Sequence, residues 1–161
     1  MKMCQEKMSI FSRVVGFYTD VASWNPGKKE LALIAEGKIS FQEISCELLF
    51  LNKEEWELIK DKQEEALSNV KEVIVTNGKE GGKIYLDGVE ACEFKTGETN
   101  SIDDTGAGDS FVVGYVTAHL KGKTTDECSE WGKMNAVSVI GHVGSKLGLL
   151  TMDQIKVHNK L

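Results

Sequence analysis

Two short, largely apolar runs separated by helical segments constrain the fold of this chain most strongly. The runs are Leu48–Leu51 and Val73–Thr76, and an uninterrupted apolar run is typical of a strand that is buried on both faces of a sheet. Lys53–Lys60 and Gln63–Val70 lie between the runs and have the pattern of helices. Because strands that alternate with helices form layered sheets, the sequence predicts an α/β fold with a mostly parallel sheet.

A hairpin is expected after the second run. Lys83–Leu86 and Val89–Phe94 have the pattern of strands, and the Asp87-Gly88 pair between them is a strong two-residue turn signal. Near the start of the chain, Met3–Ser12 could be a helix and Val14–Tyr18 a strand. Further helices are expected at Lys28–Glu36, Ala107–Leu120 and Thr125–His142, with a short final one that ends near His158.

The composition agrees with a single core-forming domain over residues 1–161. Hydrophobic residues make up 41% of the chain and charged residues 27%, as in globular proteins rather than disordered ones. The formal net charge of −6 argues against a nucleic-acid partner, because an acidic chain repels phosphates. No apolar run is long enough to span a membrane, and the first residues lack the apolar core of a secretory signal. The 4 cysteines are far apart, which favours reduced thiols in a cytoplasmic protein.

The segment Asp103–Asp109, Asp-Asp-Thr-Gly-Ala-Gly-Asp, has the features of a phosphate-binding loop. Gly106 and Gly108 allow the backbone to approach a ligand closely. An apolar helical stretch follows from Ser110, and the first turn of a helix offers unpaired N–H groups and the positive end of the helix dipole. We therefore expect an anion hole for phosphoryl oxygens at this loop.

Asp109 has two interpretations. A carboxylate beside a phosphate repels it, but the same carboxylate suits a base that accepts a proton from an attacking hydroxyl group. The alternative is that Asp109 only occupies the first turn of a helix, where a negative charge favours the dipole. Asp103–Thr105 precede it and an apolar helix follows, so we favour the base.

Asp103–Phe111 resembles the C-terminal signature of the ribokinase/phosphofructokinase-B family of carbohydrate and nucleoside kinases. The resemblance implies a ribokinase-like three-layer α/β/α fold, ATP and Mg²⁺ as nucleotide and metal, and a sugar or nucleoside as the acceptor. The residues to which it assigns catalysis are Asp109 as the base and, as the anion hole, the amides of Gly106, Ala107 and Gly108. Asp104 departs from the family pattern, which usually has Thr, Ser or Pro there.

Asn52 and Glu55 follow the first apolar run, at the edge where open α/β sheets bind their ligands. Their spacing fits a capping box, in which the two side chains close the start of a helix. The family carries an Asn-x-x-Glu element at this place in the chain, which implies a role in ordering Mg²⁺, its waters and phosphate. Capping and metal ordering can coexist.

Thr76–Gly82 follows the second apolar run and resembles the Thr-x-Gly-x-x-Gly nucleotide loop of the family. Thr76, Gly78 and Gly81 match that pattern; the alternative is a plain turn that leads into the hairpin. Asn135 lies in a stretch similar to the family segment that lines the adenine pocket, and a partly exposed helix asparagine is the equal alternative.

The resemblance covers nearly the whole chain but only the C-terminal half of the family fold. In the family, the N-terminal half supplies a Gly-Gly segment, an aspartate that binds substrate hydroxyls and a small β lid, and none of these is found here. A chain without them lacks one wall of the acceptor site and exposes a sheet edge, and such edges invite self-association. The partners expected are therefore a second copy of the chain or a complementing N-terminal half.

Three functional hypotheses follow. The first is ATP-dependent phosphoryl transfer to a hydroxyl of a sugar or nucleoside. The second is a non-catalytic nucleotide-binding fragment or subunit, active only in a complex or not at all. The third is a structural α/β domain whose glycine loop is only a tight turn.

Overall fold

The computed structural model describes residues 26–44, 46–97, 100–145 and 147–158. The segments Met3–Ser12 and Val14–Tyr18 lie outside these residues. The strands are β1 (Leu48–Asn52), β2 (Glu72–Thr76), β3 (Gly82–Leu86) and β4 (Val89–Phe94). The helices are α1 (Pro26–Ala35), α2 (Lys53–Leu58), α3 (Gln63–Asn69), α4 (Ala107–His119), α5 (Thr125–Ile140) and α6 (Met152–His158). None of the helices in the described ranges is long and apolar enough to cross a membrane.

The strands form one sheet in the order β1-β2-β3-β4. β1 and β2 run parallel, and Asn52 lies opposite Thr76 where both strands end. β3 returns antiparallel to β2, and β4 runs antiparallel to β3 after the predicted Asp87-Gly88 turn. The sheet is therefore mixed, because the hairpin adds antiparallel pairs to the parallel pair of β1 and β2.

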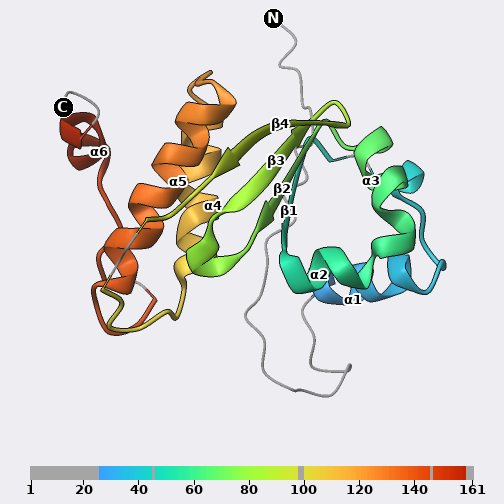
Figure 1. Cartoon of the computed structure of the whole chain (residues 1–161), viewed down its shortest axis with the longest axis horizontal. Coiled ribbons are helices and arrows are strands. Elements are labelled where there is room, and N and C mark those ends of the chain that lie inside the picture. The colour runs from blue at the N-terminus through green and yellow to red at the C-terminus, as the bar shows by residue number, and fades with distance from the viewer. Residues whose placement is uncertain (1–25, 45, 98–99, 146, 159–161) are drawn as a thin grey trace, which may run out of the picture.

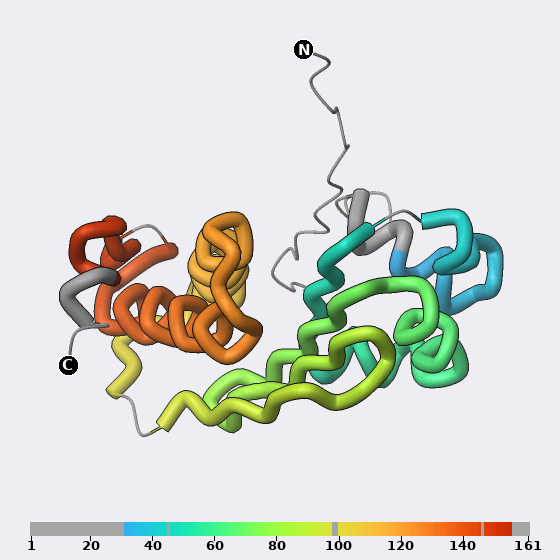
Figure 2. The backbone as a smooth tube through the Cα atoms, turned by 90° about the horizontal axis from the view of Figure 1, so that it is seen from above, coloured from blue at the N-terminus to red at the C-terminus, as the bar shows by residue number. Residues whose placement is uncertain are grey.

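Alternate residues of β1 pack into separate cores on the two faces of the sheet. Leu49 and Leu51 belong to a core shared with α1, α2 and α3. Leu48 and Phe50 belong to a core shared with α4, α5 and α6. Figures 1 and 2 show these two groups of helices on opposite faces of the sheet. Both faces of the apolar strands are thus buried, and the expected three-layer α/β/α arrangement is confirmed.

The second helical layer depends on close contact between α4 and α5. A Cβ atom on Gly114 would lie 2.4 Å from the carbonyl oxygen of Trp131, so the two backbones almost touch. At the end of α5, the carbonyl oxygen of Ile140 accepts a hydrogen bond from the Ile102 N–H at 2.8 Å. The chain that enters the glycine loop is therefore held against the C-terminal end of α5.

Candidate functional site

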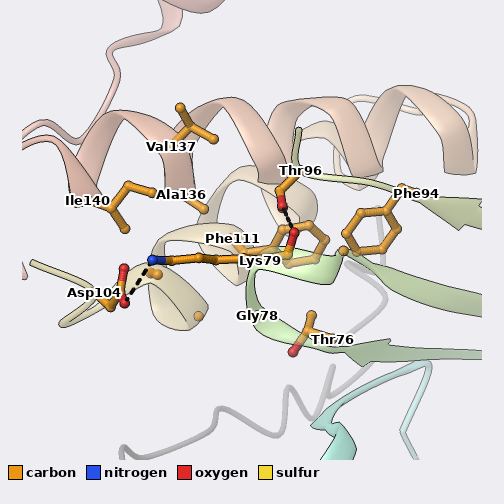
Figure 3. A pocket seen from close by; sticks show the side chains of 13 residues that line it. Thr76, Gly78, Lys79, Phe94, Thr96, Asp104, Phe111, Ala136, Val137 and Ile140 are labelled. Atoms are coloured by element: carbon orange, nitrogen blue, oxygen red, sulfur yellow. Dashed lines mark hydrogen bonds and ion pairs between the residues drawn. The ribbon is translucent and has the colours of Figure 1, made fainter. Parts of the chain in front are cut away.

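A cavity of about 460 Å³ lies between the end of β2, the end of β4, the start of α4 and the last turns of α5. Figure 3 shows side chains from all of these elements around it. The residues that line it are Thr76, Gly78, Lys79, Gly81, Phe94, Thr96, Asp104, Ala107, Gly108, Phe111, Ala136, Val137 and Ile140. Residues more than 60 positions apart in the sequence, such as Thr76 and Val137, meet at this one place.

One part of the cavity wall is apolar. The rings of Phe94 and Phe111 stack with centroids 5.2 Å apart and planes inclined by 13°. Ala136, Val137 and Ile140 contribute aliphatic groups from α5. A flat, largely apolar ligand group fits such a wall, since aromatic and aliphatic surfaces dominate small-molecule sites.

The loop after β2 supplies a polar part of the wall through Thr76, Gly78 and Gly81, and nucleotide binding by these residues stays a prediction. The Asn77 N–H donates to the Gly81 carbonyl at 2.7 Å, which closes the loop on itself. Gly81 has φ +100°, and a Cβ there would lie only 1.8 Å from the Phe94 carbonyl oxygen. A side chain at this position is therefore strongly disfavoured, and the loop lies directly against the end of β4.

The glycine loop forms the start of α4. Gly106 is its N-cap and has left-handed backbone angles, with φ +83°. A Cβ there would lie 2.5 Å from the Cβ of Ser145, so the loop also packs against the segment after α5. Ala107 and Gly108 line the cavity. The Ala107 N–H makes a long hydrogen bond of 3.3 Å to the Asp104 carbonyl. Because this bond is long and weak, the N–H group could bind a stronger acceptor instead.

Asp109 lies in the first turn of α4 and is half-buried. It follows directly on Gly108, which lines the cavity, but Asp109 is not itself part of the lining. The structure thus places the candidate base immediately beside the candidate anion hole. Its assignment as a base stays a prediction.

Asp103 has a structural function. One of its carboxylate oxygens accepts the Thr105 N–H and the other accepts the Gly144 N–H, each at 2.9 Å. Hydrogen bonding by the Thr105 side chain, and then by the Gly144 backbone, holds the pKa of Asp103 below its ordinary value. Asp103 is therefore an ionised anchor that joins the glycine loop to the segment after α5.

Asn52 and Glu55 form the capping box that their spacing predicts. The Asn52 side chain accepts the Glu55 N–H at 2.7 Å, and the Asn52 N–H donates to Glu55 Oε2 at 2.8 Å. Neither residue lines the cavity. Asn52 lies opposite Thr76 in the β1–β2 register, so the box adjoins the loop after β2 at the edge of the sheet.

The Asn52–Glu55 box is chemically suited to a divalent cation. Mg²⁺ in phosphate-transfer sites is commonly held by one or two carboxylates, waters and the substrate phosphates. Glu55 uses Oε2 for the cap, and a carboxylate has a second oxygen with which to accept a hydrogen bond from a metal-bound water. Within the described ranges, no group of three or more His, Cys, Asp or Glu side chains could enclose a metal by itself.

Asn135 is only 2% exposed and does not line the cavity. Its amide nitrogen donates to the Ser110 carbonyl at 2.7 Å, and its amide oxygen accepts the Leu150 N–H at 2.9 Å. The side chain thus ties α5 to the first turn of α4 and to the segment before α6. The partly exposed alternative does not hold, and a cofactor contact by Asn135 stays a prediction.

The described cysteines take no part in the site. Burial raises the pKa of Cys46, Cys92 and Cys128 to about 11 each. Because the thiolate is the nucleophilic form of cysteine, these thiols are poor nucleophiles at neutral pH. All three are free cysteines, as expected.

Sequence reasoning missed several residues of the cavity. Phe94 and Phe111 belong to elements that were predicted, but no local pattern shows that their rings stack. Lys79 lies inside the predicted nucleotide loop, and a cation between glycines was a signal that could have been used. Lys79 Nζ lies 3.7 Å from Asp104 Oδ2 and connects two sides of the cavity.

The sequence is similar to those of known kinases. Residues 38–152 match the pfkB family of carbohydrate kinases. A nucleoside kinase from Methanocaldococcus jannaschii is 34% identical over 113 residues, which are 66% of this chain and 37% of that protein. A nucleoside kinase from Methanothermobacter thermautotrophicus is 28% identical over 144 residues, which are 86% of this chain and 45% of that protein.

Solved structures share the fold. The nucleoside kinase of Methanocaldococcus jannaschii, an archaeal member of the ribokinase family, has a TM-score of 0.67 at 28% identity, over 89% of this chain and 46% of that one. Ribokinase from Thermotoga maritima has a TM-score of 0.61 at 25% identity, over 75% of this chain and 44% of that one. The chain thus spans less than half the length of these relatives. On the match over residues 38–152, the chain belongs to the pfkB family of carbohydrate kinases, and its fold is ribokinase-like.

Proposed function

We propose that this chain provides the nucleotide side of an enzyme that transfers the γ-phosphoryl group of ATP to a hydroxyl of a sugar or nucleoside. The observation that supports this most is the cavity itself, because two glycine loops far apart in the sequence, represented by Thr76, Gly81 and Gly108, line it together. Its volume of about 460 Å³ is in the usual range for small-molecule sites. The relatives named nucleoside kinase and ribokinase support the class of acceptor.

The parts of the cavity match the parts of a nucleotide. The apolar wall of Phe94, Phe111 and the last turns of α5 suits a purine ring. Backbone N–H groups of the two glycine loops suit the phosphates, which are also favoured at the positive end of α4. The Thr76 hydroxyl makes a long hydrogen bond of 3.4 Å to the Leu51 carbonyl, and it would serve as a further donor if it turned to a phosphate.

Asp109 would accept the proton of the acceptor hydroxyl as its oxygen attacks the γ-phosphorus. The bond between the γ-phosphorus and the β–γ bridging oxygen then breaks, and ADP leaves with the electron pair. The amides of Gly106, Ala107 and Gly108 would stabilise the negative charge that develops on the phosphoryl oxygens. Asn52 and Glu55 would hold the waters of Mg²⁺, which neutralises phosphate charge when it is bound.

A second candidate function is nucleotide binding without autonomous catalysis. The observation that favours it is the open edge of β1 in the described sheet; the chain matches 37% of the length of one nucleoside kinase relative and 45% of another. In this case the acceptor wall would come from a complementing polypeptide or a second copy of the chain. Among the described strands, β1 pairs with β2 alone, so its outer edge is the place where further strands could add.

Two measurements test these candidates in sequence. Mg-ATP should raise the thermal midpoint of the chain, because a ligand at 100 times its Kd stabilises the folded state by about 2.7 kcal/mol. No shift at millimolar nucleotide would remove both candidates. ADP release is then measured over a panel of pentoses, hexoses and nucleosides, and a rate that no acceptor raises above background would leave only the second candidate.

The replacement Asp109→Asn tests the proposed base. The variant should bind nucleotide normally and lose turnover by about 10²- to 10⁴-fold, which is the usual contribution of a general base. Asp126→Asn is the matched control, because Asp126 occupies the first turn of α5 and so has the same relation to a helix dipole. Equal turnover in both variants would assign Asp109 to the dipole alone.

A further inference from the structure

An ion pair at the edge of the cavity joins the two glycine loops. The Lys79 side chain extends from the loop after β2 to Asp104, which precedes α4, as Figure 3 shows. Nζ and Oδ2 are 3.7 Å apart, and both residues line the cavity. The side chains are 63% and 65% exposed, so the pair lies in contact with water at the edge of the cavity.

Both ends of this pair are anchored locally. The Lys79 carbonyl accepts a hydrogen bond from the Thr96 hydroxyl, which fixes the backbone of the loop against the segment after β4. The Asp104 carboxylate accepts a hydrogen bond from the Ser101 hydroxyl through Oδ1. The flexible part is therefore the lysine side chain, while the carboxylate has a second protein donor that keeps it in position.

The ion pair contributes little to stability, so the Lys79 ammonium group can leave Asp104 for a stronger anion. An exposed ion pair at this distance contributes little, since water screens it and both side chains lose freedom when it forms. The phosphates of a nucleotide carry more negative charge than one carboxylate and attract an ammonium group more strongly. The neighbouring carboxylate Asp103 accepts backbone N–H groups through both of its oxygens.

We propose that Lys79 and Asp104 act as a charge latch on the nucleotide site, in which Lys79 leaves Asp104 for a nucleotide phosphate and Asp104 opposes phosphate binding. This inference rests on the proposed function of the cavity. It makes Lys79 a determinant of affinity for the phosphate chain and Asp104 a residue that reduces it. The departure of Asp104 from the family pattern thereby acquires a physical consequence, which is a site that discriminates by phosphate charge.

The two members of the pair predict opposite effects when each is neutralised. Lys79→Met removes the cation and should weaken ADP binding by about fivefold. Asp104→Asn keeps the shape and the Ser101 hydrogen bond, removes the opposing charge and should tighten ADP binding by about threefold. If the pair were only a structural bridge between the loops, both variants would weaken binding, so the sign of the change separates the two roles.

The experiment is isothermal titration calorimetry of the whole chain with ADP and, separately, with adenosine, both without Mg²⁺. Adenosine lacks phosphates, so its affinity should not change in either variant. Lys83→Met is the matched control, because Lys83 forms an exposed ion pair with Glu90 at 2.9 Å on the hairpin and does not line the cavity. Circular dichroism of each variant checks that it is folded.

The outcomes distinguish the latch from the function on which it rests. Opposite shifts for ADP with unchanged adenosine binding support the latch. Shifts of the same sign, no shift for ADP, or equal shifts for ADP and adenosine overturn the latch and leave the nucleotide site in place. A wild-type chain that binds neither ADP nor adenosine overturns the proposed function, and the latch with it.

Discussion

At the scale of single residues, Gly81 shows how tightly the backbone determines the cavity. Its φ of +100° is unfavourable for any residue with a side chain, and the space that a Cβ would need is occupied by the carbonyl group of Phe94. A side chain at this position would therefore destabilise the folded state in two ways, through the backbone conformation of the loop and through a steric clash with β4. Only the second depends on the tertiary structure.

The replacement Gly81→Ala should separate these two effects. We expect a loss of about 2–4 kcal/mol in the free energy of unfolding, of which the positive-φ backbone accounts for about 1–3 kcal/mol and displacement of Phe94 for the rest. Gly122→Ala is the control, because Gly122 also has a positive φ, of +69°, but no atom lies within 4 Å of its Cβ position. Urea denaturation measures both, and equal losses would contradict the steric contribution.

At the scale of elements, the capping box at the start of helix α2 has two candidate functions, which are helix capping and the ordering of Mg²⁺. The capping box of Asn52 and Glu55 stabilises the helix start whether or not a metal binds nearby. Glutamine can replace glutamate in a capping box, since its side-chain oxygen accepts the same hydrogen bond. Glutamine lacks the negative charge of glutamate and has an NH2 donor in place of its second oxygen, and the charge and that oxygen are what a hydrated magnesium ion would use.

Glu55→Gln should therefore leave the free energy of unfolding within about 0.5 kcal/mol of the wild type. If Glu55 orders Mg²⁺, the variant should show a smaller increase in ATP affinity when Mg²⁺ is added, as measured by calorimetry at matched ionic strength. Glu127→Gln is the matched control, because Glu127 holds the same position in the capping box of α5. An unchanged effect of Mg²⁺ in Glu55→Gln would restrict Glu55 to capping.

A buried hydrogen bond connects the sheet with helix α4 at the end remote from the cavity. The Tyr115 hydroxyl donates to Glu72 Oε1 at 2.6 Å, and Glu72 is only 3% exposed. Burial, and then the neighbouring Glu72, raises the pKa of Tyr115, so the hydroxyl keeps its proton. The Thr125 hydroxyl also donates to Glu72 at 3.2 Å, and His119 Nδ1 lies 3.5 Å from Oε2. This contact sets the position of α4, whose opposite end carries the glycine loop.

Tyr115→Phe should lower the free energy of unfolding by about 1–3 kcal/mol, because the buried Glu72 carboxylate loses its hydrogen bond of 2.6 Å from the tyrosine hydroxyl. In a chain that already carries Glu72→Gln, Tyr115→Phe should lower the free energy of unfolding by less. Glutamine has no charge, so the loss of the tyrosine donor leaves no buried carboxylate with fewer hydrogen bonds. Chemical denaturation of the four chains in this double-mutant cycle gives the coupling energy. Equal costs in both backgrounds would show that Tyr115 contributes through packing alone.

At the scale of the whole molecule, the two helical layers have different tasks. The layer of α4 and α5 forms the cavity together with the loops of the sheet. The layer of α1, α2 and α3 covers the other face and contributes no residue to the cavity lining. Ligand binding should therefore stabilise the layer of α4 and α5 more than the layer of α1, α2 and α3.

Hydrogen–deuterium exchange with and without ADP tests this division. ADP should slow the exchange of amides in the loop after β2, in the first turn of α4 and in the last turns of α5, because these segments meet at the cavity. Amides of α1 and α3 should exchange at unchanged rates. Protection spread evenly over both layers would indicate that nucleotide stabilises the chain globally rather than at this site.

The division between local and long-range information explains which residues sequence reasoning identified. The apolar strands, the Asp87-Gly88 turn, the capping box of Asn52 and Glu55 and the left-handed Gly106 are each determined by neighbours a few residues away. Their patterns are therefore visible in the sequence, which predicts both glycine loops without knowledge of their arrangement in space. The resemblance to the family then predicts that both loops bind the same nucleotide.

Only the tertiary structure decided which side chains face the cavity. The Asn135 amide is held between Ser110 and Leu150, where α5 lies against α4 and the segment before α6, and its predicted contact with a cofactor stays a prediction. The Phe94–Phe111 stack and the Lys79–Asp104 pair join residues 17 and 25 positions apart, and no local pattern encodes such contacts. The sequence by itself determined the glycine loops at Thr76–Gly81 and Asp103–Asp109, because backbone conformation is a local property. The packing of helices on the sheet determined what surrounds those loops, because it depends on contacts between distant elements.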